Sequence, residues 1–188
     1  SDCDCPSRVN GIAFRPARDE PRLAVPTGFE AVGAATDPHT GLPLRLRHRA
    51  SGYELALVPE GLYLVGSASA VDQPDYLRSP RIARAATFWI GVREVSRGEY
   101  LGAHRAGARA DEAMTGVAWR LASAWCARNG MRLPREDEWE IAARGPHALA
   151  FPWGESWDSA AAAADAPNAF GLLGTARVPA EWCVDRAR

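Results

Sequence analysis

The stretch Gly116–Gly145, GVAWRLASAWCARNGMRLPREDEWEIAARG, decides the fold class. Its first half carries Val117, Leu121 and Trp125 at four-residue spacing, which places three apolar side chains on one face of a helix. Asn129-Gly130 then supplies a left-handed residue of the kind that ends helices. The pattern predicts a helix that begins at Val117, stops before Asn129 and buries Trp125.

The second half of the same stretch predicts another helix. It follows Pro134, and its first turn, Glu136–Glu138, places acidic side chains where the helix dipole favours negative charge. Gly145 supplies the end. We expect Trp139 to face inward from this helix.

Strand and cap signals precede these helices. Two apolar runs, Leu55–Val58 and Leu62–Val65, flank Pro59-Glu60-Gly61 and predict a β-hairpin. A further strand is expected over Ala86–Val92. The spacing of Ser96-Arg97-Gly98-Glu99 is that of a capping box, which predicts a helix start at Ser96.

The chain has room for one domain with a single core, because it contains 188 residues. Residues 1–50 are rich in Pro, Gly and Arg without sustained periodicity, and they are expected to form an irregular N-terminal arm with a short strand at Leu42–Arg47. Residues 51–188 are expected to form the domain itself.

Charge and hydropathy exclude two classes of partner. Twenty-two basic and 23 acidic residues leave a formal charge of −1, so we expect neither nucleic acid nor an anionic membrane as partner. No apolar run is long enough to cross a membrane, and the N-terminus has no features of a signal peptide. The compartment stays open on this evidence, with the cytoplasm favoured.

The cysteines and histidines form no recognisable motif. Cys3, Cys5, Cys126 and Cys183 are too few for a disulfide scaffold at this length, and we expect Cys3 and Cys5 to be free. Cys126 is expected to be buried and unpaired, with a bridge to Cys3 or Cys5 as the alternative. The histidines, which lack metal-ligand spacing and are expected at the surface, are His39, His48, His104 and His147.

Five ordered blocks of the sequence resemble the formylglycine-generating enzyme family, also called sulfatase-modifying factors. The blocks are LVPEGLYLVGS (57–67), FWIGVREVSRGEY (88–100), the 116–145 stretch, FPWG (151–154), and PNAFGL with EWC (167–172 and 181–183). The resemblance implies an α+β fold, C-type-lectin-like and of the formylglycine-generating type, irregular, with few short strands and two to three helices. The residues that match the structural motif of the family are Trp89, Glu94, Trp125, Arg132, Leu133, Pro134, Glu138, Trp139, Trp153, Asn168, Gly171, Glu181 and Trp182.

The departures from the family pattern concern its chemistry. The resemblance implies a further segment after EWC with a cysteine pair that binds copper and carries out oxidation, and these 188 residues contain no match to it. The Gly-Asn of the family's calcium loop falls on Arg177-Val178, which leaves Glu181 as the one retained ligand. We therefore expect no catalytic residues and neither calcium nor copper, with Glu181, Cys3 and Cys5 as the weak candidates for a metal.

Two functions follow from the resemblance and its departures. The first is a non-catalytic binding or scaffolding module that recognises a protein or peptide. The alternative is a copper-dependent oxidase that converts a sulfatase cysteine to formylglycine, of which this chain is one part. Because the strands that close the sheet in the family are absent here, we also expect either the N-terminal arm or a second chain to cover an open sheet edge.

Overall fold

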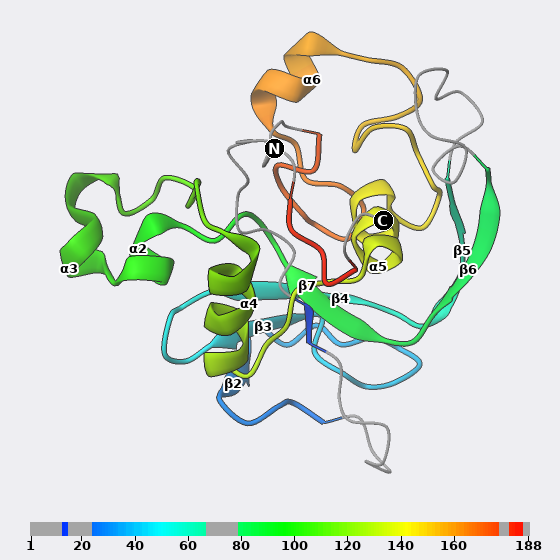
Figure 1. The fold of residues 1–188 in the computed structure, drawn as a ribbon. Helices are drawn as coiled ribbons and strands as arrows, with labels where there is room; N and C mark the ends of the chain where they lie inside the picture. The colour runs from blue at the N-terminus through cyan, green and yellow to red at the C-terminus, as the bar shows by residue number, and fades with distance from the viewer. Residues whose placement is uncertain (1–12, 15–23, 67–78, 177–180, 186–188) are drawn as a thin grey trace.

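The computed structural model of the chain describes residues 13–14, 24–66, 79–176 and 181–185. It is an α+β structure with two antiparallel sheets and several short helices (Figure 1), which confirms the predicted fold class. The strands are β1 (Ala13–Phe14), β2 (Phe29–Ala31), β3 (Arg45–His48), β4 (Glu54–Val58), β5 (Gly61–Val65), β6 (Arg81–Ala85) and β7 (Phe88–Gly91). The helices are α2 (Arg97–Leu101), α3 (Ala103–Ala106), the 3-10 helix η1 (Gly107–Arg109), α4 (Trp119–Arg128), α5 (Glu136–Arg144) and α6 (Ser159–Ala164).

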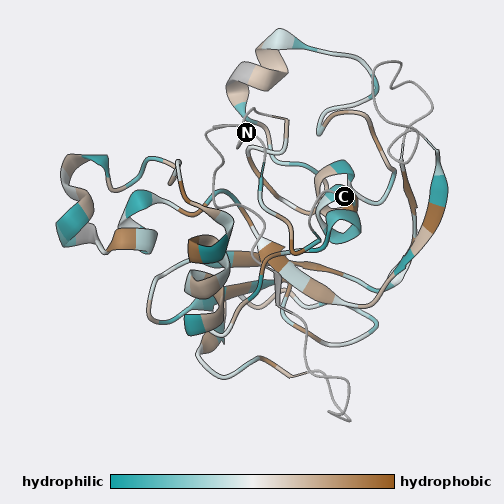
Figure 2. Ribbon diagram, viewed as in Figure 1, coloured by the Kyte–Doolittle hydropathy of each residue, from teal (hydrophilic) through white to brown (hydrophobic). Residues whose placement is uncertain are grey.

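The larger sheet has the strand order β1-β7-β4-β3-β2, with each neighbouring pair antiparallel. At its centre Leu57 of β4 lies opposite Trp89 of β7, and Leu55 lies opposite Leu46 of β3. Figure 2 shows these central strands as hydrophobic. They are buried on both faces, because helices cover the sheet from either side.

Alternate residues of β4 and β7 belong to two separate hydrophobic clusters. Leu55, Leu57 and Trp89 pack with residues of α4 in the first cluster, which also contains Trp125 and Cys126. The second cluster, formed on the opposite face, packs Ala56, Val58, Phe88 and Ile90 with α5 and the β5–β6 ribbon. This two-sided burial follows from the period-two alternation of side chains along a strand.

The predicted β-hairpin of Leu55–Val58 with Leu62–Val65 is wrong. Both runs are strands, but β4 pairs with β3 and β7, whereas β5 pairs with β6 in a separate two-stranded sheet. After Val58 the chain leaves the larger sheet, held by a bond of 2.8 Å from the Tyr63 hydroxyl to the Pro59 carbonyl. Because β3, which directly precedes β4 in the chain, pairs along one edge of β4 and β7 pairs along the other, β4 has no free edge for a hairpin with β5.

The described parts of the predicted N-terminal arm, residues 13–14 and 24–50, are more regular than expected. They supply β1, β2 and β3 to the larger sheet, and Phe29, Leu42 and Leu46 are buried in the first cluster. Sheet pairing supplies order that local periodicity does not signal. The domain boundary at residue 50 stays a prediction.

The predicted cap and helix ends agree with the structure. Ser96 and Glu99 form the two bonds of a capping box, 3.2 and 2.7 Å long, at the start of α2. Trp125 of α4 is buried, and Gly130 after it has a φ of 69°. Leu121 is a correction, because it is 59% exposed and the buried face of α4 is formed by Ala122, Trp125 and Cys126.

Two further observations concern the described residues. His48 was expected at the surface but is buried, with its Nδ1 2.8 Å from the Ser51 hydroxyl, and burial lowers its pKa. Its position on β3 within a paired sheet accounts for the difference. None of the helices in the described part of the chain is long and apolar enough to cross a membrane.

Candidate functional site

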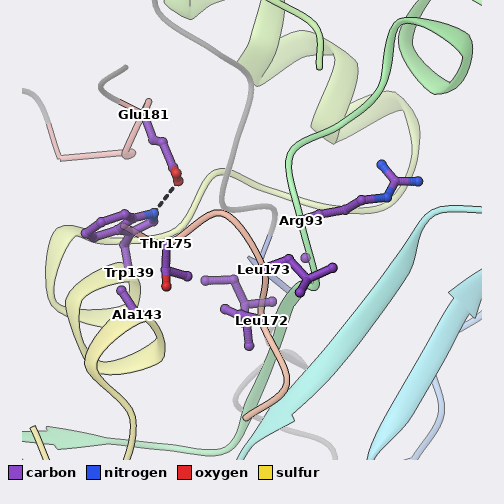
Figure 3. Close-up of a pocket in the computed structure, with 9 residues that line it drawn as sticks. Arg93, Trp139, Ala143, Leu172, Leu173, Thr175 and Glu181 are labelled. Atoms are coloured by element: carbon purple, nitrogen blue, oxygen red, sulfur yellow. Dashed lines mark hydrogen bonds between the residues drawn. The ribbon is translucent and has the colours of Figure 1, made fainter. Parts of the chain in front are cut away.

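Motif residues that lie far apart in the sequence meet in a small pocket between α5, the end of β7 and the chain around residue 173. Figure 3 shows its lining, which includes Arg93, Trp139, Thr175 and Glu181. The pocket has a volume of about 20 Å³. That volume corresponds to a single water molecule.

Glu181 is fixed within this pocket by a tryptophan. The indole Nε1 of Trp139, on α5, donates a hydrogen bond to the Glu181 carboxylate (Figure 3). Two further indoles hold the chain beside Glu181, because Trp182 donates to the Val117 carbonyl at 2.7 Å and Trp119 donates to the Cys183 carbonyl at 2.8 Å. Residues 181–183, the EWC block, are therefore hydrogen-bonded both to α5 and to the chain at the start of α4.

Asn168 joins the end of α5 to the loop that forms the pocket wall. Its side-chain NH₂ donates to the carbonyls of Ala142 and Ala143 at 2.6 and 2.9 Å, and its Oδ1 accepts from the amides of Phe170 and Leu172, both at 3.0 Å. Carbonyls at a helix end lack intrahelical partners, and Asn168 supplies them. The buried amide group is fully bonded, which is the condition for burying it.

Two glycines of the same loop have a positive φ and lie against the ends of charged side chains. Gly171 has a φ of 74°, and a Cβ there would come within 2.0 Å of the Arg45 guanidinium, which donates to the Gly171 carbonyl at 3.0 Å. A Cβ at Gly174 would come within 2.8 Å of the Glu94 carboxylate. These approaches place the matching residues Gly171 and Glu94 in the framework of the loop.

The start of α5 is held by carboxylates. Glu138 accepts two hydrogen bonds from Arg132, and it also accepts from the amide of Arg135 at 2.8 Å. Burial would raise the pKa of Glu138, but the bonds from Arg132 and Arg135 outweigh it, so its pKa lies below the ordinary value. Asp185 accepts from the Glu136 amide at 3.1 Å, which supplies the cap that the Arg135 side chain does not provide.

The remaining motif residues lie elsewhere. Trp89 and Trp125 belong to the first hydrophobic cluster, and Leu133 and Pro134 are buried before α5. Trp153 lies in a different part of the molecule, between α5 and α6. The motif residues therefore belong to the hydrophobic core and to the hydrogen bonds that stabilise it, as well as to the pocket.

The oxygen donors in the pocket do not fit calcium, which takes six to eight oxygen ligands. Glu181 is bonded to Trp139, and Arg93, which also lines the pocket, directs its guanidinium to the Glu99 carboxylate. Thr175 adds one hydroxyl, whose Oγ1 is buried without a hydrogen-bond partner. Within the described ranges no group of three or more His, Cys, Asp or Glu side chains could hold a metal ion.

The described thiols do not fit copper in the form that binds it, which is the thiolate. Cys126 and Cys183 are both free thiols. Burial raises the pKa of each to about 12, and for Cys183 neighbouring carboxylates such as Glu181 add to the effect. The prediction that Cys126 is buried and unpaired is confirmed. Cys3 and Cys5 lie outside the described residues.

A second candidate site lies on the chain between α5 and α6. An open groove there is lined by residues 153–159, and the rings of Phe151, Trp153 and Trp157 contact one another beside it. We call it the aromatic groove. Trp153 belongs to the FPWG block of the sequence, whereas Trp157 was not predicted as a site residue. The available signal was three aromatic residues within seven positions of a Pro-, Gly- and Ser-containing stretch.

The central part of the chain matches a known protein family. Residues 102–175 match the model of the sulfatase-modifying factor enzyme 1-like domain. The chain contains a formylglycine-generating-enzyme-like domain. The matched range includes α4, α5, Asn168 and the aromatic groove, so the family resemblance inferred from the five blocks is confirmed. The relation to C-type lectins stays a prediction.

Relatives of this formylglycine-generating-enzyme-like domain carry names that differ in activity. The inactive C-alpha-formylglycine-generating enzyme 2 of Bos taurus is 50% identical over 42 residues, which is 22% of this chain and 14% of that protein. The formylglycine-generating enzyme of Thermomonospora curvata is 34% identical over 96 residues, covering 37% of this chain and 32% of that protein. The serine/threonine-protein kinase pkn1 of Chlamydia pneumoniae is 41% identical over 83 residues, covering 38% of this chain and 13% of that protein. The matches thus span a third or less of each relative.

Proposed function

We propose that the chain acts as a non-catalytic binding or scaffolding module that recognises a protein or peptide partner. The proposal is supported by the hydrogen bonds that the polar motif residues make within the chain. Glu181 accepts from Trp139, Asn168 uses both donors and its acceptor within the chain, and Glu138 is bonded to Arg132. These groups stabilise the fold and are not free to handle a substrate.

The geometry of the pocket and the state of the thiols support the same function. A pocket with the volume of one water molecule cannot admit a peptide cysteine, and protonated thiols are poor nucleophiles and poor metal ligands. In contrast, the aromatic groove is open. The inactive name of the bovine relative is compatible with this proposal, whereas the T. curvata relative motivates the oxidase alternative.

An oxidase assay separates the two functions. The purified full chain is incubated with copper, oxygen and a peptide that carries a sulfatase cysteine motif, and aldehyde is measured with a hydrazide probe and by mass spectrometry. We expect no aldehyde above the protein-free control while near-ultraviolet circular dichroism reports a folded chain. Copper-dependent aldehyde formation would overturn the proposal, and Cys126→Ser and Cys183→Ser variants would then test which thiol takes part.

A second chain that covers an open sheet edge also remains a proposal. The outer face of the β5–β6 ribbon exposes Leu62, at 72%, and Ile82, at 64%, and β5 pairs only with β6 within the described residues. Light scattering on the purified chain tests it. A stable dimer that dissociates in a Leu62→Arg variant would support a second chain, and a monomer at all concentrations would contradict self-association.

A further inference from the structure

The aromatic groove lies on the chain between α5 and α6, and this segment runs through the upper part of Figure 1. Its exposed ring is Trp157, which is 59% exposed. Phe151, Trp153 and Trp157 belong to neither of the two hydrophobic clusters. The rings therefore form a satellite cluster whose outer surface contacts solvent.

A tight turn fixes the first two rings. The amide of Phe151 donates to the Gly154 carbonyl at 2.9 Å, and the amide of Gly154 donates back to the Phe151 carbonyl at 3.1 Å. Pro152 and Trp153 form the corner of this turn, where proline presets the backbone. The Phe151 and Trp153 rings stack with an interplanar angle of 4° and centroids 5.5 Å apart. The turn thus holds the two rings in a defined position.

Trp157 completes the arrangement. Its ring meets Trp153 at 68° and Phe151 at 72°, with centroids 5.6 and 5.4 Å apart. The indole Nε1 of Trp153 donates to the Ser156 carbonyl at 3.1 Å, which fastens the chain between the two tryptophans. The polar group of Trp153 is thereby satisfied within the chain, and the exposed Trp157 indole is the ring presented to a partner.

The charged residues that line the groove are acidic. The nearest described guanidinium in the sequence, that of Arg144, donates to the carbonyls of Ala148 and Leu149, outside the lining of the groove. Glu155 and Asp158 line the groove itself, and both residues are exposed. The Oδ1 of Asp158 accepts from the amides of Ala160 and Ala161 at the start of α6, and this position also keeps its negative charge beside the groove.

An exposed indole flanked by carboxylates is complementary to a cationic side chain. The face of an aromatic ring carries negative electrostatic potential, so an ammonium or guanidinium group is attracted to it. Arginine is the better match of the two, because its planar guanidinium stacks on an indole and presents several donors to carboxylates. We propose that the aromatic groove binds a basic peptide segment, with an arginine side chain on Trp157 and Glu155 and Asp158 as its counter-charges.

This inference rests on the proposed binding function and names the class of partner. Because the turn and the ring contacts hold the aromatic side chains in place before binding, little conformational freedom is lost when the peptide binds. Because the carboxylates are exposed, the attraction weakens as salt screens it. Binding is therefore expected to be selective for basic peptides and sensitive to ionic strength.

Fluorescence anisotropy of a labelled hexa-arginine peptide tests the inference on the full chain. We expect saturable binding that weakens with added salt, and no binding of a hexaglutamate peptide. Trp157→Ala should weaken binding at least about threefold, the effect of an exposed cation–π contact. Glu155→Gln, an exposed change that leaves the turn intact, should weaken it about twofold. Leu121→Ala is the matched control, because Leu121 is also 59% exposed but lies on α4.

Each other outcome contradicts the inference. Equal affinity of the wild type and both groove variants would place hexa-arginine binding elsewhere. Binding of neutral maltohexaose in place of hexa-arginine would assign the groove to a saccharide. If hexa-arginine does not bind and no aldehyde forms in the oxidase assay, the inference fails while the proposed function stands. Aldehyde formation would contradict the proposed function whichever probe binds. Should Trp157→Ala unfold the chain, the Glu155→Gln comparison still decides.

Discussion

The guanidinium of Arg132 and the carboxylate of Glu138 form two hydrogen bonds, each 2.7 Å long. Arg132 also donates to the Leu133 carbonyl at 3.0 Å. The pair links the chain before Pro134 to the first turn of α5, and the Glu138 side chain is largely removed from solvent. A forked contact of this kind fixes the direction in which a helix begins, as well as its stability.

Removal of Arg132 is expected to destabilise the fold. Arg132→Ala leaves the buried Glu138 carboxylate without its cation, which is expected to lower the free energy of unfolding by ~2–3 kcal/mol. Urea denaturation followed by tryptophan fluorescence measures the change. Arg47→Ala is the control, because it breaks the exposed Arg47–Glu54 pair and should cost under ~1 kcal/mol. Equal effects of the two variants would contradict the prediction.

Glu138 also predicts how stability depends on acid. Its pKa in the folded chain is lower than the ordinary value of 4.5, so its contribution is fully present above that value and is lost as pH falls through the folded pKa. Denaturation series at several pH values should give a smaller acid-side loss for Glu138→Gln than for the wild type. Parallel pH profiles would show that the carboxylate contributes nothing to the acid dependence.

Asn168 is expected to be the most sensitive residue of the pocket wall. Asn168→Ala removes four hydrogen bonds and leaves the carbonyls of Ala142 and Ala143 without those donors, at a cost of ~3 kcal/mol. Asn168→Asp keeps the acceptor but loses the donors, so it should still be destabilised. In the Asn168→Ala variant, the amides of Phe170 and Leu172 should exchange their hydrogens faster than in the wild type. Unchanged protection at both amides would contradict the role given to Asn168.

Gly91 is predicted to be constrained by Tyr53. A Cβ at residue 91 would come within 1.9 Å of the Tyr53 hydroxyl oxygen, which donates to the Arg93 carbonyl. Gly91→Ala should therefore destabilise the chain by ~2–3 kcal/mol, since overpacking forces neighbouring groups to move. In a double-mutant cycle, Tyr53→Phe should recover part of this loss by removing the nearest atom. Strict additivity of the two changes would refute the contact.

The two described thiols should react slowly in the folded chain. Burial raises the pKa of Cys126 and Cys183 to about 12 from the ordinary 9.0, so their stabilising contribution is present below pH 9 and is lost as pH rises toward the folded value. In a Cys3→Ser/Cys5→Ser background, iodoacetamide at pH 8 should label neither thiol until urea is added. Rapid labelling of the native chain would contradict the prediction.

Local signals in the sequence predicted α2, α4 and α5, whereas α3 and α6 were not predicted. The caps at Ser96 and Gly145 and the burial of Trp125 depend on residues within one or two turns, and these features match the structure. Strand partners depend on residues far apart in the chain, which is why the pairing of β4 was wrong although its strand was right. Leu121 was misplaced because an apolar residue can lie beside the buried face of a helix and remain exposed.

The candidate sites were less predictable than the fold. Glu181 and Trp139 were both identified as motif residues, but nothing in their 42-residue separation indicates that one donates a hydrogen bond to the other. The arrangement of Trp157 depends on the turn at Pro152-Trp153 and on ring packing, neither of which leaves a periodic pattern. A resemblance to a family matches residues individually, whereas the contacts between these residues depend on the folded structure.

The two clusters share β4 and β7 in alternate positions, and this gives the sheet a means of rejecting mispairing. Sliding β4 by one residue would turn Leu55 and Leu57 into the space shaped for Ala56 and Val58, and would leave voids beside Trp89. Because the larger side chains of β4 lie on one face and its smaller ones on the other, the offset structure would be overfilled on one side and hollow on the other. The different side-chain volumes on the two faces of β4 thus disfavour an offset alignment with β7 during folding.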